Sequence, residues 1–290
     1  MDRRDVVAAV FAAFIWGATF PISALALEST PPIFFTFLRF FCAALFVVTI
    51  ARPRVSWWKL TLAGLLLGAG QYGLMFTSMA MGLPAGLASL LVHTQAFFTI
   101  LIAMAVFSER LDGRAAFAVL LALAGLACLI LDRSDASALE GIGLILLAAL
   151  CGAGGNIVLK SMGQVDMLAV VVWMSLMSPI PLGILSLLLE SNGDPLSLFA
   201  KVGWMTAFAV AYSALLATIV VFTIWGRLLV KYDASNVAPF FLLVPVFGIS
   251  LSAVILGERL TTFQMTGAGL IFCGLALTLW PRSKRELEAG

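Results

Sequence analysis

The sequence predicts an all-α polytopic membrane protein with ten transmembrane helices, arranged as two inverted five-helix repeats. Three observations lead to this fold class: an apolar composition, ten apolar segments of spanning length, and a motif that recurs in the second half. Of the 290 residues, 62% are hydrophobic and 11% are charged, and the mean hydropathy is +1.10. A soluble domain carries about a quarter charged residues because its surface must be hydrated. Most side chains here must therefore face lipid or other helices, and the net charge of +2 favours no nucleic-acid partner.

The ten apolar segments are the elements of this fold. A membrane span needs about 20 apolar residues to cross about 30 Å of hydrocarbon, and it must be helical because lipid cannot hydrogen-bond the backbone. The N-terminal run from Val6 to Leu27 is longer than the hydrophobic region of a signal peptide, so it is counted as the first span. The predicted spans are 6–27, 33–51, 58–80, 84–107, 115–131, 141–161, 167–189, 202–228, 234–256 and 262–280.

Lysine and arginine are distributed unevenly between the two sides of the predicted spans. Basic residues are enriched in cytoplasmic loops of membrane proteins. With the N-terminus in the cytoplasm, 13 of the 17 basic residues face the cytoplasm, and only Arg133, Lys201 and Arg259 face outward. Because the number of spans is even, both termini are predicted to be cytoplasmic.

The two halves, residues 1–135 and 136–290, share a sequence pattern. Ser-Glu-Arg-Leu at 108–111 recurs as Gly-Glu-Arg-Leu at 257–260, and Gly17-Ala18 recurs as Gly152-Ala153. The Glu-Arg pairs lie at span ends and are expected to cap helices, form ion pairs in loops and anchor the protein at the membrane interface. Since each half has five spans, the repeats must be inverted in the membrane. Inverted repeats are typical of alternating-access carriers with a site at the midplane, which favours a carrier over a duplication that serves only the fold.

These motifs, in this order, resemble the drug/metabolite transporter superfamily, specifically its ten-helix EamA-type exporters. The first half departs from the family pattern, with Gln95-Ala96 where a proline is expected and Ser108 in place of glycine. The residues that carry the resemblance are Trp16-Gly17, Phe20, Leu38-Arg39-Phe40, Pro245, Gly257-Glu258-Arg259-Leu260, Gly267 and Gly274.

The resemblance also implies a function. Within the superfamily the chain is most similar to bacterial amino-acid exporters of the YddG type, which are associated with aromatic and other neutral amino acids. This similarity implies a multi-pass protein of the bacterial inner membrane that exports a small molecule, needs no cofactor and works as a monomer or homodimer in contact with membrane lipid.

Polar side chains near the middle of the predicted spans mark the candidate substrate site, because such groups are unfavourable in lipid. Tryptophan and tyrosine normally lie at the membrane interfaces, so their presence at mid-depth predicts a partly hydrated cavity. The predicted substrate-binding residues are Trp16, Gln71, Tyr72, Ser89, His93, Asn156 and Tyr212.

His93 is the only histidine of the chain, and it lies one helical turn from Ser89. Its ring could contact substrate or couple transport to protons, or it could form a structural hydrogen bond to a neighbouring helix. Gln95 lies about 200° around the helix from His93, so only one of the two is expected to face the cavity. Arg39 could bind a carboxylate, but the resemblance favours a structural role, and Arg39 is left out of the predicted site.

Other function classes are disfavoured by what the sequence lacks. No carboxylate lies inside a predicted span, which favours facilitated export, or proton coupling through His93 alone. The four cysteines lie in apolar runs without metal-ligand spacing, and no catalytic motif is present, so neither an enzyme nor a metal site is predicted. The alternatives within the carrier class are drugs or metabolites such as nucleotide sugars, although few midplane charges are present to bind phosphate. The rival outside that class is a channel.

Overall fold

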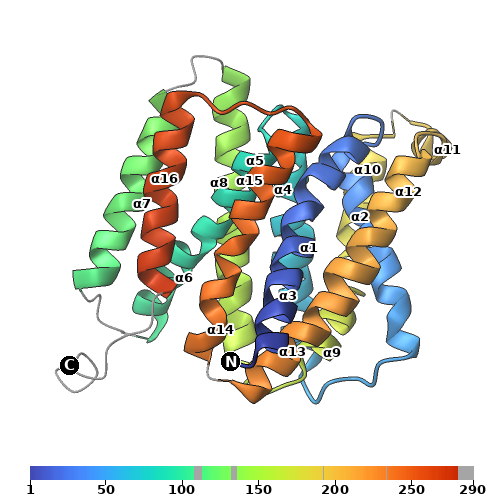
Figure 1. The fold of residues 1–290 in the computed structure, drawn as a ribbon. Coiled ribbons are helices and arrows are strands. Elements are labelled where there is room, and N and C mark those ends of the chain that lie inside the picture. Colours follow the sequence, from blue (N-terminus) through green and yellow to red (C-terminus); the bar gives the residue numbers. More distant parts are fainter. Residues whose placement is uncertain (108–112, 132–135, 192, 233, 280–290) are drawn as a thin grey trace.

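A computed structural model describes residues 1–107, 113–131, 136–191, 193–232 and 234–279 (Figure 1). Within these ranges the chain forms helices and turns and contains no strand. Most of the long helices run up and down in one bundle, and the N-terminus lies at one end of it (Figure 1). The all-helical architecture predicted from the sequence is therefore confirmed.

The described part of the first half contains seven α-helices, α1 to α7, and three segments of other helical types, η1 to η3. Their bounds are α1 (Arg3–Leu27), α2 (Pro32–Ala44), η1 (Leu45–Val48), α3 (Trp57–Ala63), η2 (Gly64–Tyr72), α4 (Gly73–Ala80), α5 (Ala85–Leu91), η3 (Val92–Thr94), α6 (Gln95–Phe107) and α7 (Gly113–Leu131).

The second half continues the bundle with helices that are also broken within several of the predicted spans. Their bounds are α8 (Ala136–Lys160), α9 (Met167–Met174), α10 (Pro179–Leu189), α11 (Pro195–Ala200), α12 (Trp204–Ala211), η4 (Tyr212–Val220), α13 (Val221–Lys231), α14 (Ala234–Phe241), α15 (Leu243–Ile255) and α16 (Thr262–Leu279).

Seven helical segments of the described chain are long and apolar enough to cross a membrane. They are Arg3–Leu27, Trp57–Ala80, Ala85–Ile102, Gly113–Leu131, Leu139–Lys160, Met167–Leu189 and Trp204–Lys231. Three more apolar helices are shorter, namely Pro32–Val48, Pro239–Ile255 and Thr262–Thr278. Each of these segments overlaps one of the spans predicted from hydropathy, because burial in lipid or among helices requires the same local composition.

Helix α7 shows how the bundle places large and small side chains. Its Phe117 and Leu120 are exposed, whereas Gly125 is buried against α16. A Cβ atom at Gly125 would lie 2.5 Å from the carbonyl oxygen of Gly267, so a larger residue would push the two helices apart. Small residues between helices and large apolar residues facing outward are typical of membrane bundles.

Two long helices are wound as π-helix at their centres. These segments, η2 and η4, are each nine residues long and begin 148 positions apart. A π-helix has hydrogen bonds between residues i and i+5 and is therefore wider than an α-helix, and such segments are frequent at functional sites. Segment η2 ends on Gln71 and Tyr72, two of the predicted site residues.

Two glutamates bind the N-termini of helices that are distant from them in the sequence. Glu190 accepts hydrogen bonds from two backbone N–H groups at the start of α2, and Glu258 does the same for α5. The first N–H groups of a helix have no partner within it, so these carboxylates satisfy them. The capping role expected for Glu258 is confirmed, whereas the first copy of the motif, at 108–111, lies outside the described residues.

Candidate functional site: a central cavity

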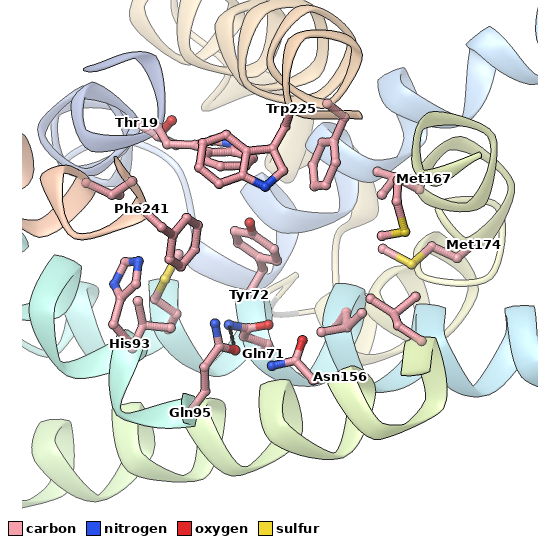
Figure 2. A pocket seen from close by; sticks show the side chains of 18 of the residues that line it. Thr19, Gln71, Tyr72, His93, Gln95, Asn156, Met167, Met174, Trp225 and Phe241 are labelled. Atoms are coloured by element: carbon pink, nitrogen blue, oxygen red, sulfur yellow. Dashed lines mark hydrogen bonds between the residues drawn. The ribbon is translucent and has the colours of Figure 1, made fainter. Parts of the chain in front are cut away.

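A cavity of about 350 Å³ lies inside the bundle, and both halves of the chain line it (Figure 2). The first half contributes side chains from α1, α2, η2, α4, η3 and α6, and the second half contributes α8, α9, α13, α14 and α15. A mostly apolar cavity of a few hundred Å³ with a few polar groups is the usual form of a small-molecule site. The polar side chains of the lining are Thr19, Arg39, Gln71, Tyr72, His93, Gln95 and Asn156.

Four aromatic rings form one wall of the cavity. The ring centroid of Trp16 lies 5.4 Å from that of Phe222, 5.3 Å from that of Trp225 and 5.5 Å from that of Phe241. The Trp16 Nε1–H donates a hydrogen bond to the carbonyl oxygen of Ala217, in η4, at 2.9 Å. Because this bond satisfies the indole N–H of Trp16, Trp16 offers its ring surface rather than a donor. Such a surface suits aromatic groups and organic cations.

Three amide side chains form the facing wall. Gln71 Nε2 donates to Gln95 Oε1 at 2.9 Å, and Asn156 Nδ2 donates to Thr99 Oγ1 at 3.3 Å. Gly152 of α8 makes room for the Gln71–Gln95 pair, because a Cβ atom at Gly152 would clash with Gln95 Oε1. Within the described structure, Gln71 Oε1 and Asn156 Oδ1 accept no hydrogen bond. Figure 2 shows these amides across the cavity from Trp225 and Phe241.

His93 lies beside the aromatic wall, with its ring centroid 4.9 Å from that of Phe241 (Figure 2). Its Nδ1 atom is 2.6 Å from the carbonyl oxygen of Ser89, one turn earlier in the chain. A carbonyl oxygen can only accept, so Nδ1 carries the hydrogen, and Nε2 of a neutral ring is left as an acceptor. His93 can therefore accept a hydrogen bond from a molecule in the cavity.

The family is shown by comparison with known proteins. The model of the EamA-like transporter family matches residues 4–131 and again residues 139–280. The chain belongs to the EamA-like transporter family. It is therefore a transporter with several membrane-spanning helices, and the family resemblance noted from the sequence motifs is confirmed.

Relatives of this EamA-like transporter cover its whole length. It is 36% identical over 298 residues to the "Probable amino-acid metabolite efflux pump" of Escherichia coli (strain K12), with all of both chains covered. It is 37% identical to the protein of the same name from Salmonella typhimurium, covering 97% of this chain and 96% of the relative. A solved crystal structure superposes with a TM-score of 0.58 over 94% of this chain and 96% of its own at 19% identity, which supports the fold alone.

In this transporter, five of the seven predicted site residues line the cavity. They come from four different helical segments, as expected for a site enclosed by the bundle. These five are Trp16, Gln71, Tyr72, His93 and Asn156.

The other two predicted residues, Ser89 and Tyr212, do not line the cavity. Ser89 is fully buried and its hydroxyl donates to the carbonyl oxygen of Gly86 at 2.6 Å. Tyr212 donates its hydroxyl to the carbonyl oxygen of Ile15 at 2.9 Å, which ties the start of η4 to α1. Both hydroxyls are therefore bonded to backbone carbonyl groups, that of Ser89 within α5 and that of Tyr212 in another helix.

Gln95 and His93 both line the cavity of the transporter, whereas the sequence predicted that only one would. The prediction assumed an α-helix, which places residues two apart 200° around the axis. The chain is instead a 3₁₀-helix at Val92–Thr94. At three residues per turn, two positions span 240°, so the two side chains are about 120° apart the short way round. Arg39 also lines the cavity, although it was excluded from the predicted site.

Sequence reasoning also missed two helical faces of the lining. The first face lies on α13, where the lining residues are spaced three, one and three positions apart: Phe222, Trp225, Gly226 and Leu229. This is the spacing of one helical face, so a search for aromatic residues with that periodicity could have found it. The second face, on α9, consists of Met167, Val171 and Met174.

The cavity of the transporter extends from the middle of the bundle toward the end that carries the N-terminus. Leu159 near the end of α8, Met167 at the start of α9 and Leu229 near the end of α13 all line it. These helix ends lie near the N-terminus in Figure 1. Among the described residues, no group of three His, Cys, Asp or Glu side chains could hold a metal ion.

Proposed function

We propose that this transporter exports neutral amino acids, aromatic ones among them, by alternating access around the central cavity. The single observation that carries the proposal is the cavity itself, in which an aromatic wall faces an amide wall with unpaired oxygens. The aromatic faces suit an apolar side chain or an ammonium group, and the amide oxygens can accept from that ammonium. The names of the two relatives, each called a probable amino-acid metabolite efflux pump, support the same substrate class.

The proposed architecture has ten spans in two inverted repeats, residues 1–135 and 136–290. Seven long and three shorter apolar helices support the span count. The two matches of the family model and the two π-helical segments support the repeat. Equivalent packing supports it further: Gly17 of the first span lies against α15 of the ninth, and Gly152 of the sixth lies against Gln95 of the fourth.

The proposed orientation places both termini in the cytoplasm of a bacterium, with the transporter in the inner membrane. The basic residues of the described loops support it, while residues 280–290 lie outside the described part. Since the cavity extends toward the end with the N-terminus, the structure then corresponds to an inward-facing state. In that state a cytoplasmic amino acid can enter the cavity before export.

In the proposed site, Trp16, Gln71, Tyr72, His93 and Asn156 contact the substrate. Gln95 is added to this set because it shares a hydrogen bond with Gln71. The Ser89 hydroxyl is bonded within α5 and the Tyr212 hydroxyl is bonded to α1, so neither residue is included in the proposed site.

Counterflow in proteoliposomes tests the proposed function. The purified full-length chain is reconstituted with one unlabelled amino acid inside, and uptake of labelled amino acids is measured with and without a pH gradient. A carrier gives accelerated uptake when substrate is present on the opposite side, whereas a channel does not. If no neutral amino acid shows saturable counterflow, the substrate class is wrong.

Two substitutions test the site. Trp16→Ala and His93→Ala should each lower counterflow at least about tenfold, because each removes a wall group that contacts substrate. Trp204, which is 80% exposed, provides the matched control Trp204→Ala, and this variant should transport normally. Gel filtration and thermal unfolding in detergent show whether each variant is folded. Normal counterflow by folded Trp16→Ala and His93→Ala would exclude the proposed site.

A further inference from the structure

Arg39 of α2 is a buried cation at the wall of the cavity. Its side chain is 4% exposed, and the residue belongs to the cavity lining. The Nε and Nη1 atoms are buried and have no hydrogen-bond partner among the described residues. A buried guanidinium with free N–H groups is unfavourable unless an acceptor compensates it.

The surroundings of Arg39 hold the guanidinium without neutralising it. Its central carbon lies 4.0 Å from the centre of the Tyr72 ring, 5.7 Å from that of Phe40 and 5.8 Å from that of Phe76. Ring faces attract the cation, but the N–H donors point outward in the guanidinium plane and are not satisfied by a stacked ring. Among the described residues, the cavity lining contains no Asp or Glu that could pair with Arg39.

Two other arginines show what a structural role looks like in this protein. Arg52 donates from Nη2 to the carbonyl oxygen of Val55 at 3.1 Å, and Arg114 donates from Nε to that of Leu277 at 2.8 Å. Arginines that serve only to hold helices are expected to bond carbonyls or acidic groups in this way. Arg39 forms no such bond with the described part of the chain, so its missing acceptor must come from elsewhere.

We propose that Arg39 binds the carboxylate of the transported molecule, an inference that rests on the proposed function and specifies its substrate class. A carboxylate matches the fork of a guanidinium with two parallel hydrogen bonds. The substrate class is then small molecules with a free carboxylate, whose ammonium and side chain face the amide and aromatic walls. Amino-acid amides, esters and the corresponding amines leave Arg39 unpaired and are rejected. Tyr72, which also lines the cavity, contributes by stacking on the guanidinium.

Binding by the wild-type protein gives the first test. The detergent-purified full chain is titrated with each neutral amino acid and with its amide, and tryptophan fluorescence reports binding because Trp16 and Trp225 line the cavity. We expect every amino acid that binds to do so at least about tenfold more tightly than its amide. This comparison needs no variant, so it cannot fail through misfolding.

Substitution of Arg39 gives the second test. Arg39→Gln should abolish the preference for the carboxylate over the amide, and Arg39→Lys should retain part of it, because an ammonium keeps the charge but loses the fork. The matched control is Arg52→Gln, since Arg52 also stacks on an aromatic ring, with its central carbon 4.1 Å from the centre of the Trp57 ring. A purely structural Arg39 would lower binding of amino acid and amide alike and leave their ratio unchanged.

The outcomes separate this inference from the proposed function. If amino acids are transported but their amides bind equally well, or if Arg39→Gln keeps the preference, Arg39 does not bind the carboxylate and the proposed function stands. If no amino acid binds or is transported, both are overturned. A preference in the wild type that Arg39→Gln loses and Arg52→Gln keeps supports the inference.

Discussion

The two ends of the bundle are held together in different ways. At the end opposite the N-terminus, Glu190 and Glu258 each accept two hydrogen bonds from the backbone of a distant helix. At the end with the N-terminus, Lys231 binds Asp2 at 2.8 Å and Asp5 at 2.7 Å. Both carboxylate caps are partly buried, whereas the Lys231 side chain is 54% exposed.

From this difference we expect the end with the N-terminus to separate more easily than the opposite end. A carboxylate on a partly buried helix N-terminus satisfies donors that have no other partner, so its loss leaves them unpaired. Exposed ion pairs are screened by water and salt and contribute little. The cavity extends toward the end with the weaker contacts. Four substitutions test whether the two ends differ as these contacts indicate.

The largest expected effect is on access to the cavity. Gly226 lines the cavity, and a Cβ atom there meets no other atom within 4 Å, so Gly226→Cys should be tolerated. In a variant without the four native cysteines, we expect Gly226→Cys to react with a membrane-impermeant maleimide from the side that carries Lys231 and not from the other side. Met81→Cys, in the turn after α4, is the control for the opposite end. Labelling of Gly226→Cys only from the side that carries Met81 would mean that the cavity is open at that end instead.

The next largest effect concerns the cap of α5. Glu258 accepts from the backbone N–H groups of Ala85 at 2.6 Å and Gly86 at 2.9 Å. Glu258→Ala leaves both donors unpaired, so the free energy of unfolding should fall by about 1.5–3 kcal/mol, the range for hydrogen bonds to charged groups. Denaturant titration of the detergent-purified protein measures this. Glu28→Ala, which removes an exposed carboxylate, should leave the stability unchanged.

A smaller effect is expected at the cap of α2. Glu190 accepts from the N–H groups of Ile33 and Phe34, both at 2.8 Å, and from the Ser186 hydroxyl at 2.8 Å. Ser186→Ala keeps the two backbone bonds and removes only the third, so the free energy of unfolding should fall by about 0.5–1.5 kcal/mol. The same titration measures it. A loss equal to that of Glu258→Ala would mean that the hydroxyl, rather than the backbone, anchors Glu190.

The smallest effect is expected at the N-terminal end. Hydrogen bonding from Lys231 lowers the pKa of the Asp2 carboxyl below its ordinary value of 3.8. A lowered carboxyl pKa stabilises the fold above that ordinary value, and the contribution is lost as the pH falls through the lowered pKa. Lys231→Ala should therefore lower the unfolding temperature only slightly at pH 7, and not at all in about 1 M salt or at a pH below the lowered pKa of Asp2. A large decrease in the unfolding temperature that does not depend on salt would mean that the ion pairs of Lys231 stabilise the fold as much as the carboxylate caps do.

Much of the fold could be predicted from the sequence. The span predicted at 33–51 corresponds to α2 and η1, and the span at 84–107 corresponds to α5, η3 and α6. Hydropathy suffices for this because each span needs its own apolar residues to be stable in lipid, whichever helices surround it. The sequence also places Trp16, Tyr72 and His93 near the middle of their predicted spans, because that position depends only on where a residue lies along its own span.

The direction in which each side chain points was decided by the tertiary structure. A 3₁₀ turn brought Gln95 into the cavity with His93, and packing against α1 turned the hydroxyl of Tyr212 away from it. The Nε and Nη1 atoms of Arg39 have no partner because no helix in the described part of the chain places an acceptor within hydrogen-bond distance of them. Composition along one helix sets how deep a residue lies in the membrane, whereas the local helix type and the neighbouring helices set what it faces.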